Sequence, residues 1–259
     1  MPKLISLNAW GGKGREALLA FVEQEEKDTD VFCFQEIFQS DTCAWLPSGC
    51  HADLYRELEK ALPGFVGYFS PEQDGFDIHG KVPAELGLSI GHATFVRKEV
   101  LVTTQGHFFI YRERNGIQNE DTKTMPKLAD YVAVRFGGEH YIIVNVHGLW
   151  WPYDKLDTEE RIAQSGKLRT FLDGRSEKKI LCGDLNLRPE TRSIYILDEV
   201  MRNLVKEYGV KTTRSAHYDF LASDPFADYV FVSHDVRVIN FSLPDVAVSD
   251  HLPLVLQFQ

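Results

Sequence analysis

Short apolar runs with strand-like character recur along the chain, and several end on a side chain that can bind a cation or move a proton. The run Lys179–Cys182 leads through Gly183 to Asp184 and Asn186. Side chains alternate faces along a strand, so these two polar groups leave the strand end on the same side. Together they can hold a water molecule and a phosphate oxygen, although a Gly-Asp turn followed by a turn-forming Asn explains the same pattern.

Polar residues at strand ends occur too often in this chain to be explained by chance. Eight residues terminate or flank an apolar run: Asn8, Glu36, His147, Asp184, Asn186, Asp228, Asp250 and His251. Taken alone, Glu36 is equally well read as an exposed strand end, because a carboxylate that closes an apolar strand must face solvent or a cation. The whole set predicts one face of the molecule that is lined by carboxylates and histidines.

The spacing of apolar residues predicts a strand-rich chain with a few helices. Helices are expected at Arg15–Lys27, Asp53–Leu62 and Ser193–Leu204, and another begins with Asp157 as N-cap and Glu160 three residues later. Strands are expected at 3–8, 30–36, 65–70, 86–97, 100–109, 130–136 and 141–147, with further strands after Asp228 and after His251.

The charge balance opposes loose binding to polyanions. The chain has 28 Lys and Arg against 38 Asp and Glu, a net charge of −10, which disfavours adhesion to nucleic acid or to anionic membranes. The nearest approach to a basic cluster is the polar segment Tyr111–Lys127, which is expected to be a solvated surface loop. A local site that carries a metal ion would still allow an acidic protein to cleave a polyanion.

Length and composition indicate one globular domain over residues 1–259, since no linker-like segment interrupts the chain. A strand that begins by Lys3 and the lack of a long apolar run predict no signal peptide, no stable membrane association and a cytoplasmic location. No obligate protein partner is evident. Cys33 and Cys182 are expected to be buried thiols, whereas Cys43 and Cys50 are either free or paired.

Aromatic residues follow the strand that ends on His147. Trp150 and Trp151 are adjacent, and two neighbouring side chains of an extended segment cannot both face the same core. At least one is therefore expected to be exposed beside the polar strand ends, where it would form a wall for a substrate. Packing beneath the following helix is the alternative.

Five motifs in order make the chain resemble a known family. They are LNAW with Asn8, FQE with Glu36, GDLN with Asp184 and Asn186, ADYVFVS with Asp228, and SDHLPL with Asp250 and His251. This set resembles the endonuclease/exonuclease/phosphatase superfamily, the DNase I-like metal-dependent phosphoesterases, over Leu4 to Leu256. The resemblance implies an α/β (α+β) four-layer sandwich, in which two mixed β-sheets pack face to face with helices outside and the site lies where strand ends of both sheets meet.

The resemblance also implies a divalent cation, Mg²⁺ or Mn²⁺. Such hard cations prefer oxygen ligands, and Glu36 is the best single candidate for a metal ligand, with Asp250 and Asn8 near the metal or bound to it. The metal would polarise the phosphate and stabilise the leaving oxygen, while Asp184 would orient or deprotonate the attacking water. Asn186 would fix the nucleophile or a phosphate oxygen.

The histidines receive roles from the same resemblance. His251 would hydrogen-bond the phosphate as an imidazolium, and Asp228 would hold that ring and raise its basicity. His147 matches a position at which DNase-like and sphingomyelinase-like members carry a second histidine, which makes it a candidate general acid for the leaving group.

The sequence leaves the substrate open between a phosphodiester and a phosphomonoester. Trp150, Trp151, Trp10 and Arg188 are the expected substrate-binding residues. GDLNLRP resembles the tyrosyl-DNA phosphodiesterase version of its motif, so a nuclease or a phosphodiesterase that processes DNA ends is an alternative. A fold that has lost catalysis and acts as a binding scaffold is another, although the chain keeps every metal and histidine position.

Overall fold

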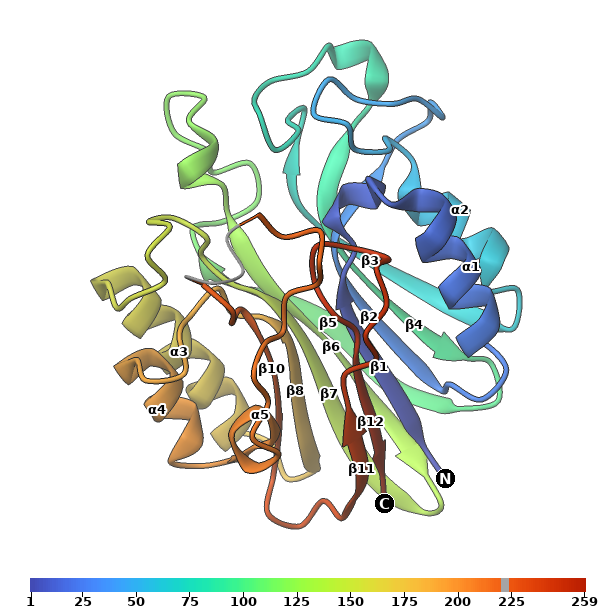
Figure 1. Ribbon diagram of the computed structural model, residues 1–259, viewed down its shortest axis with the longest axis vertical. Helices are drawn as coiled ribbons and strands as arrows, with labels where there is room; N and C mark the ends of the chain where they lie inside the picture. The colour runs from blue at the N-terminus through green and yellow to red at the C-terminus, as the bar shows by residue number, and fades with distance from the viewer. Residues whose placement is uncertain (220–223) are drawn as a thin grey trace.

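Two six-stranded sheets form the centre of the computed structural model, which describes residues 1–219 and 224–259 (Figure 1). The strand order in the first sheet is β11 (Val238–Ser242), β12 (Leu254–Phe258), β1 (Lys3–Asn8), β2 (Val31–Gln39), β4 (Ser89–Arg97) and β3 (Phe65–Asp74). In the second sheet it is β5 (Leu101–Tyr111), β6 (Lys127–Phe136), β7 (Glu139–His147), β8 (Lys178–Asp184), β10 (Asp228–Val232) and β9 (Arg202–Asn203).

The strand directions bring the polar strand ends together. β1 is parallel to β2 and β7 is parallel to β8, so Asn8, His147 and Asp184 stand at carboxyl ends of strands. β10 is antiparallel to β8, and its first residue, Asp228, pairs with Asp184. One end of the sandwich therefore collects the predicted polar residues of both sheets.

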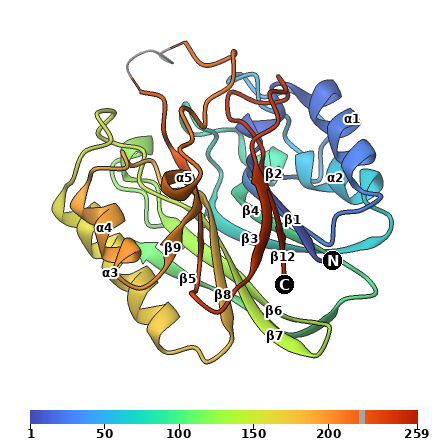
Figure 2. The same ribbon diagram turned by 60° about the horizontal axis from the view of Figure 1, so that its bottom comes forward.

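Helices cover the outer faces of the two sheets, as both ribbon views show (Figures 1 and 2). The helices α1 (Arg15–Glu25) and α2 (Leu54–Ala61) pack on the first sheet, and α3 (Glu159–Asp173), α4 (Arg192–Asp198) and α5 (Leu204–Glu207) lie with the second. Single 3₁₀ turns occupy Trp10–Gly12, Ala84–Leu86 and Thr122–Thr124. The predicted four-layer sandwich is confirmed.

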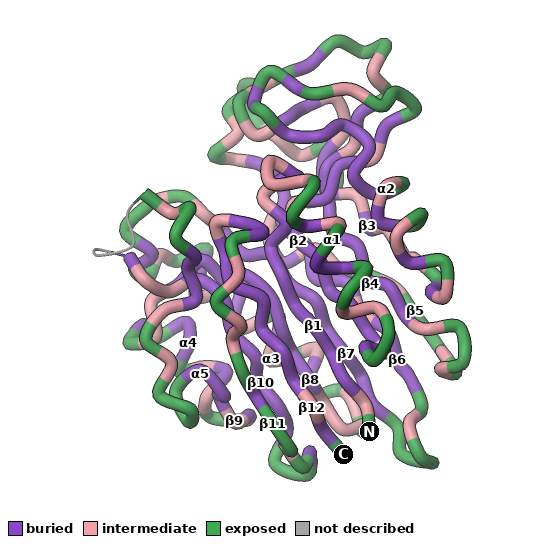
Figure 3. Tube along the Cα trace, turned by 45° about the vertical axis from the view of Figure 1, so that its right-hand side comes forward, coloured by how far each residue is buried: buried purple, intermediate pink, exposed green. Residues whose placement is uncertain are grey.

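The central strands are buried on both faces, which explains their continuous apolar sequences (Figure 3). On β1, Leu4 belongs to the core that contains residues of both sheets, whereas Ile5 packs with residues of α1 and α2. Alternate residues of one strand thus serve two cores, and the polar residue inside β1, Ser6, is buried and accepts from Gln35 Nε2 at 3.4 Å.

Two helix predictions are wrong in detail. The stretch predicted as one helix, Ser193–Leu204, is α4 followed by the short strand β9 and then by α5. The N-cap of α3 is Thr158, whose hydroxyl accepts from Arg161 N. Asp157 instead accepts hydrogen bonds from Arg192 N and Ser193 N at the start of α4, so it ties the two helix starts together.

Other predictions are corrected at β2 and β6. β2 does not end at Glu36 but continues to Gln39, and the register shifts between Phe34 and Ile37. Glu36 has a φ of 56° within this bulge, so its side chain leaves the regular alternation. Lys127 is not part of a solvated loop: it begins β6 and is 2% exposed.

The thiols and the membrane expectation can also be compared with the structure. All four cysteines are free, so Cys43 and Cys50 do not pair. Cys33 and Cys182 are buried as expected. Over residues 1–219 and 224–259, no helix combines the length and the apolar character that a membrane crossing requires.

Candidate active site

A cavity of about 850 Å³ opens at the end of the sandwich where the polar strand ends meet. Nine of the twelve predicted site residues line it: Trp10, Glu36, His147, Trp150, Asp184, Asn186, Arg188, Asp250 and His251. Asn8 and Asp228 are buried and contact the lining carboxylates and histidine, and Trp151 lies 38% exposed in the loop beside it. The structure therefore brings the predicted site together.

Asn8 joins the carboxylates of the two sheets. Its Nδ2 donates to Glu36 Oε1 at 3.0 Å and to Asp184 Oδ2 at 3.1 Å, while its Oδ1 accepts from Trp10 N at 2.9 Å. The amide nitrogen, and not the oxygen, faces the carboxylates. In this arrangement Asn8 positions Glu36 and Asp184, and its place in a metal site stays a prediction.

The Glu36 carboxylate is partly buried and lies among other negative charges. Burial and the neighbouring Asp250 carboxylate raise the pKa of Glu36 to about 7, with a further contribution from Asp184. Three carboxylates that gather in a buried cavity repel one another unless a cation lies among them. The oxygen donors of Glu36 and Asp250 therefore fit a hard divalent cation such as Mg²⁺ or Mn²⁺.

Asp184 is held in place by the turn that follows β8. Its Oδ1 accepts from Asn186 N at 2.8 Å, and Asn186 Nδ2 donates to Gly148 O at 3.4 Å. The residue before it must be glycine, because Gly183 has a φ of 130° and a Cβ there would lie 2.1 Å from Val146 O. The GDLN motif thus combines a backbone that only glycine accommodates with two polar side chains.

His251 is held between a carboxylate and a guanidinium. Its Nδ1 lies 2.8 Å from Asp228 Oδ2, and its Nε2 is in hydrogen-bond contact with Arg214 Nη1. Thr213 Oγ1 accepts from Asp228 N at 3.2 Å and so fixes the start of β10. Ser249 Oγ donates to Asn8 O at 2.6 Å, which ties the His251 loop to the first sheet.

The surroundings of His251 favour its neutral form. Burial, followed by the Arg214 guanidinium, lowers the pKa of His251 to about 4, and burial raises the pKa of Asp228 to about 7. A guanidinium can only donate, so Nε2 accepts and the ring proton is on Nδ1, facing Asp228. Desolvation and the Arg214 charge outweigh the attraction of Asp250 and Asp184 here, whereas the imidazolium expected beside a bound phosphate stays a prediction.

His147 has a different partner behind its ring. Its Nε2 lies 3.7 Å from Glu36 Oε1 and 3.9 Å from Asp184 Oδ2, and its Nδ1 lies 3.3 Å from Lys127 Nζ. Burial and then the Lys127 charge hold the pKa of His147 well below its usual range. Lys127 Nζ also lies 3.2 Å from Glu72 Oε2.

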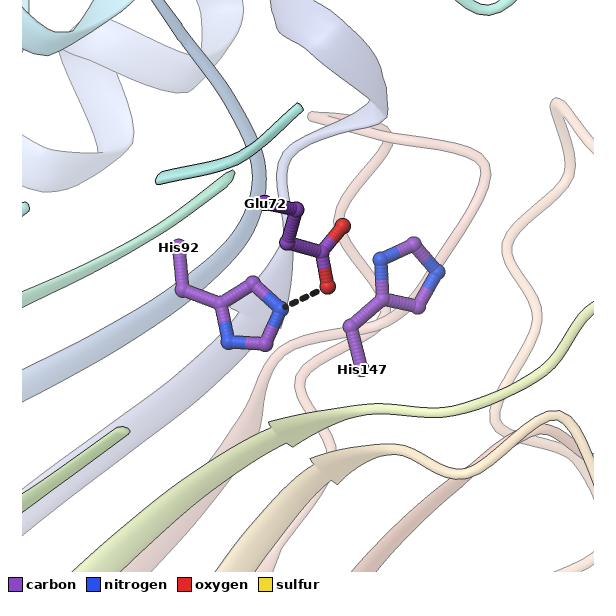
Figure 4. Close-up of side chains that lie close together, drawn as sticks. All are labelled: Glu72, His92 and His147. Atoms are coloured by element: carbon purple, nitrogen blue, oxygen red, sulfur yellow. Dashed lines mark ion pairs between the residues drawn. The ribbon is translucent and has the colours of Figure 1, made fainter. Parts of the chain in front are cut away.

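Figure 4 shows that the Glu72 carboxylate lies between the rings of His92 and His147. His92 Nε2 is 3.2 Å from Glu72 Oε1, and its Nδ1 is 3.2 Å from Asp130 Oδ1. Burial lowers the pKa of His92, but the hydrogen bonds and charges of Asp130 and Glu72 outweigh it and raise this pKa to about 9. Glu72, His92 and His147 have the spacing of a metal site. The Lys127 ammonium, however, already provides the positive charge that a metal ion would bring to the Glu72 carboxylate.

Four residues near the cavity were missed by sequence reasoning: Glu72, Lys127, Lys155 and Arg214. Lys155 Nζ lies 2.7 Å from Asp224 Oδ2 and lines the cavity, and Arg214 is 5% exposed. Lys127 could have been placed from the sequence, because it directly precedes the strand-like run of residues 128–136. The other three are isolated polar residues whose neighbours in space are far away in sequence.

Arg161 organises the aromatic loop that forms one wall of the cavity. This fully buried side chain on α3 donates to the carbonyls of Leu149, Pro152 and Leu156, at 2.6–3.3 Å. Trp150 and Trp151 contact each other in this loop, with ring centroids 6.0 Å apart. One of the two is exposed, as the sequence predicted, and Lys123 Nζ lies 4.1 Å from its ring centroid.

Comparison with solved structures shows the same fold in several proteins. A family protein from Leptotrichia buccalis has 17% identity and a TM-score of 0.73, with 100% of both chains covered. A mannosyl-6-phosphatase from Bacteroides thetaiotaomicron has 16% identity and a TM-score of 0.71, again with 100% of both chains covered. A humanized D. rerio TDP2 has 16% identity and a TM-score of 0.70, with 100% of this chain and 98% of the other covered.

These identities are low, so the structures establish the fold and leave the substrate open. No curated protein sequence matches the chain. The family model described as the endonuclease/exonuclease/phosphatase family matches residues 5–251, which span every predicted motif. Its members are hydrolases of phosphoesters that generally use divalent metals. The chain belongs to the endonuclease/exonuclease/phosphatase family.

Proposed function

We propose that the protein is a divalent-metal-dependent phosphoesterase that hydrolyses a phosphodiester or a phosphomonoester by in-line attack of an activated water. The position of Asp184 carries this proposal. Its Oδ2 lies 3.1 Å from Asn8 Nδ2, 3.7 Å from His251 Nε2 and 3.9 Å from His147 Nε2. A carboxylate in this position can orient a water molecule and receive its proton beside groups that bind phosphate oxygens.

Glu36 and Asp250 would hold Mg²⁺ or Mn²⁺. The bound cation would polarise the phosphate and stabilise the charge that develops on the leaving oxygen. Asn8 keeps Glu36 and Asp184 apart at fixed distances through its two hydrogen bonds. The elevated pKa of Glu36 supports this assignment, since a cation would favour the ionised carboxylate.

The remaining site residues would bind the transferred group. Asn186, on the same turn as Asp184, would fix the attacking water or a phosphate oxygen. Asp228 holds the ring of His251, whose Nε2 faces the cavity together with Arg214. Arg214 would contribute a fixed positive charge toward the phosphate.

The cavity fits a compact substrate. Its volume suits a small molecule or the end of a nucleic acid, and Trp10, Trp150 and Arg188 line the approach to Asp184. The net charge of −10 supports a small phosphoester over a long nucleic acid. The names of two fold neighbours, a mannosyl-6-phosphatase and a TDP2, suggest sugar phosphates and phosphotyrosyl ends as test substrates.

The test is hydrolysis of a substrate panel with Mg²⁺, Mn²⁺ or EDTA. The panel contains p-nitrophenyl phosphate, bis-p-nitrophenyl phosphate, mannose 6-phosphate, single- and double-stranded DNA and a phosphotyrosyl-ended oligonucleotide. We expect metal-dependent turnover of one class and a loss of about 10³-fold in Asp184→Asn. The exposed Asp245→Asn is the matched control and should keep full activity.

Two results would contradict this function. Turnover that survives both Glu36→Gln and Asp184→Asn would show that the catalytic site lies elsewhere. A folded protein that turns over no substrate of the panel with either metal would favour a binding scaffold.

A further inference from the structure

We propose that Lys127 is a positioning residue that holds His147 as the neutral tautomer with its proton on Nε2. On this basis His147 donates a hydrogen bond to the phosphate or to the leaving oxygen, and it is not the acid that protonates the leaving group. The role in catalysis rests on the proposed function, whereas the tautomer does not.

The argument starts from the contact between Lys127 and His147. Lys127 Nζ lies 3.3 Å from His147 Nδ1, and both side chains are almost completely buried. An ammonium group carries three N–H donors and no acceptor. His147 Nδ1 must therefore accept with its lone pair, and the single ring proton is on Nε2.

The groups that face Nε2 agree with this tautomer. Glu36 Oε1 and Asp184 Oδ2 lie 3.7 Å and 3.9 Å from His147 Nε2, and both are acceptors. A lone pair on Nε2 would instead point at two carboxylates. The Nε2–H group is thus directed at the place where the phosphate would lie between Glu36 and Asp184.

Lys127 is itself fixed by a network of hydrogen bonds and ion pairs that spans the two sheets. Glu72 accepts from Lys127 Nζ at 3.2 Å and from Leu128 N at 3.1 Å, and it lies 3.2 Å from His92 Nε2. The network continues from His92 to Asp130, which also accepts from Thr94 Oγ1 at 2.5 Å. Because its members come from β3, β4 and β6, the ammonium group has little freedom to leave His147.

A protonated His147 would bring two cations together. With protons on both ring nitrogens, its Nδ1–H would point at the Lys127 ammonium, and a donor would face a donor in a buried site. The group that contacts His147 Nδ1 is therefore the Lys127 ammonium, although the Glu72 carboxylate also lies within 4.8 Å of a ring nitrogen of His147. His147 remains able to donate from Nε2 without accepting a second proton.

The first experiment observes the tautomer directly. Histidine ¹⁵N shifts and long-range ¹H–¹⁵N correlations distinguish a protonated ring nitrogen from one with a lone pair, and the His147→Gln spectrum identifies the His147 signals. We expect Nδ1 as the lone-pair nitrogen and Nε2 as the protonated one in the metal-free protein. A protonated Nδ1 would overturn the proposal whether or not the protein is an enzyme.

The second experiment separates a donor from an acid. The side-chain amide of Gln can donate a hydrogen bond near the Nε2 position but cannot deliver a proton. With an active substrate whose leaving group is an alkoxide, which needs a proton or a hydrogen bond as it departs, we expect His147→Gln to keep at least about tenfold more kcat than His147→Ala. Equal losses in the two variants, with both folded by circular dichroism, would overturn the donor role.

A third set of variants tests Lys127. Lys127→Arg keeps a donor at Nδ1 and should keep the wild-type tautomer. Lys127→Met combined with Glu72→Gln removes both charges together, so no buried charge is left unpaired. In this double variant we expect mixed tautomer signals and about a tenfold lower kcat with KM within twofold. An unchanged His147 spectrum would show that Lys127 does not set the tautomer.

Discussion

The two histidines at the cavity are equally buried but have opposite partners. His147 and His251 are 4% and 3% exposed, and each presents Nε2 to Asp184 at a distance below 4 Å. Behind Nδ1, His147 has the Lys127 ammonium and His251 has the Asp228 carboxylate. The first ring can therefore donate from Nε2, whereas the second accepts there. The residue behind the ring, rather than the ring itself, decides what the histidine offers to a substrate.

The residue behind each histidine, Lys127 for His147 and Asp228 for His251, is also held in place by different parts of the fold. Lys127 belongs to a polar network that links strands of both sheets, through Glu72 and His92. Asp228 is supported locally by Thr213 and by the Arg214 contact with His251. A substitution on the Lys127 side should therefore affect folding stability as well as activity, while one on the Asp228 side should mainly affect activity.

The largest effect is expected for Asp228→Asn, which changes the group behind the His251 ring. An Asn amide can turn its NH₂ group to His251 Nδ1, which would move the ring proton to Nε2, against the Arg214 donor. We expect kcat/KM to fall by about 10²- to 10³-fold with the fold intact. Steady-state kinetics on the active substrate would measure this loss.

Two further variants test whether Asp228 acts through His251. Because Asp228 acts through His251, the double variant Asp228→Asn with His251→Ala should be no slower than His251→Ala alone, within about threefold. The His147 ¹⁵N signals should stay as in the wild type. Additive losses in the double variant would show that Asp228 has a separate role.

The next effect is pH-dependent stability on the Lys127 side. The pKa of His92 is about 9 in the folded protein and 6.5 in the reference state, so protonated His92 stabilises the fold. This contribution is complete below pH 6.5 and is lost as the pH rises from 6.5 through 9. The shift corresponds to roughly 3 kcal/mol, because each pKa unit is worth about 1.4 kcal/mol.

Urea unfolding at pH 6 and pH 9.5 measures this effect. The free energy of unfolding should fall between these pH values in the wild type, and it should fall by less in His92→Gln. Equal pH dependence in the two proteins would mean that His92 is neutral between Glu72 and Asp130.

The smallest effect is expected at Asp157, which lies outside both histidine environments. Its carboxylate accepts from Arg192 N and Ser193 N, so Asp157→Ala should lower the free energy of unfolding by about 1 kcal/mol. Activity should stay within twofold of the wild type. Thr158→Ala, which removes the cap of α3, is the matched control and should cost a similar amount. A large activity loss in Asp157→Ala would show that the loop between these helices is coupled to the site.

Most of the architecture could be predicted from the sequence. Strands buried on both faces appear as largely apolar runs. The polar residue that follows each run marks the end of the strand, as at Asn8 and His147. The bulge at Glu36 could not be predicted, because nothing in FQEIF indicates a residue with positive φ. The prediction of one helix over 193–204 was wrong, because its apolar spacing is equally compatible with two short helices, α4 and α5, separated by β9.

Part of the site was predictable, but its hydrogen-bond directions were not. The motifs contain lining residues such as Asp184, whereas Lys127 and Arg214, which also line the cavity, lie outside every motif. These two cations set the hydrogen-bond direction of His147 and of His251. The orientation of the Asn8 amide likewise depends on Trp10 N and on two carboxylates. These groups are brought together by strands of two different sheets, and no local sequence pattern predicts such contacts.

The buried Arg161 has a consequence for how quickly and tightly a substrate binds. Its guanidinium holds the carbonyls of Leu149, Pro152 and Leu156, so the loop that carries Trp150 is ordered before any ligand arrives. Ordering a flexible side chain on binding costs about 0.5–1.5 kcal/mol, and a loop ordered in advance avoids much of this loss. The aromatic wall should therefore act as a rigid template, with association limited by diffusion and access rather than by closure of the loop.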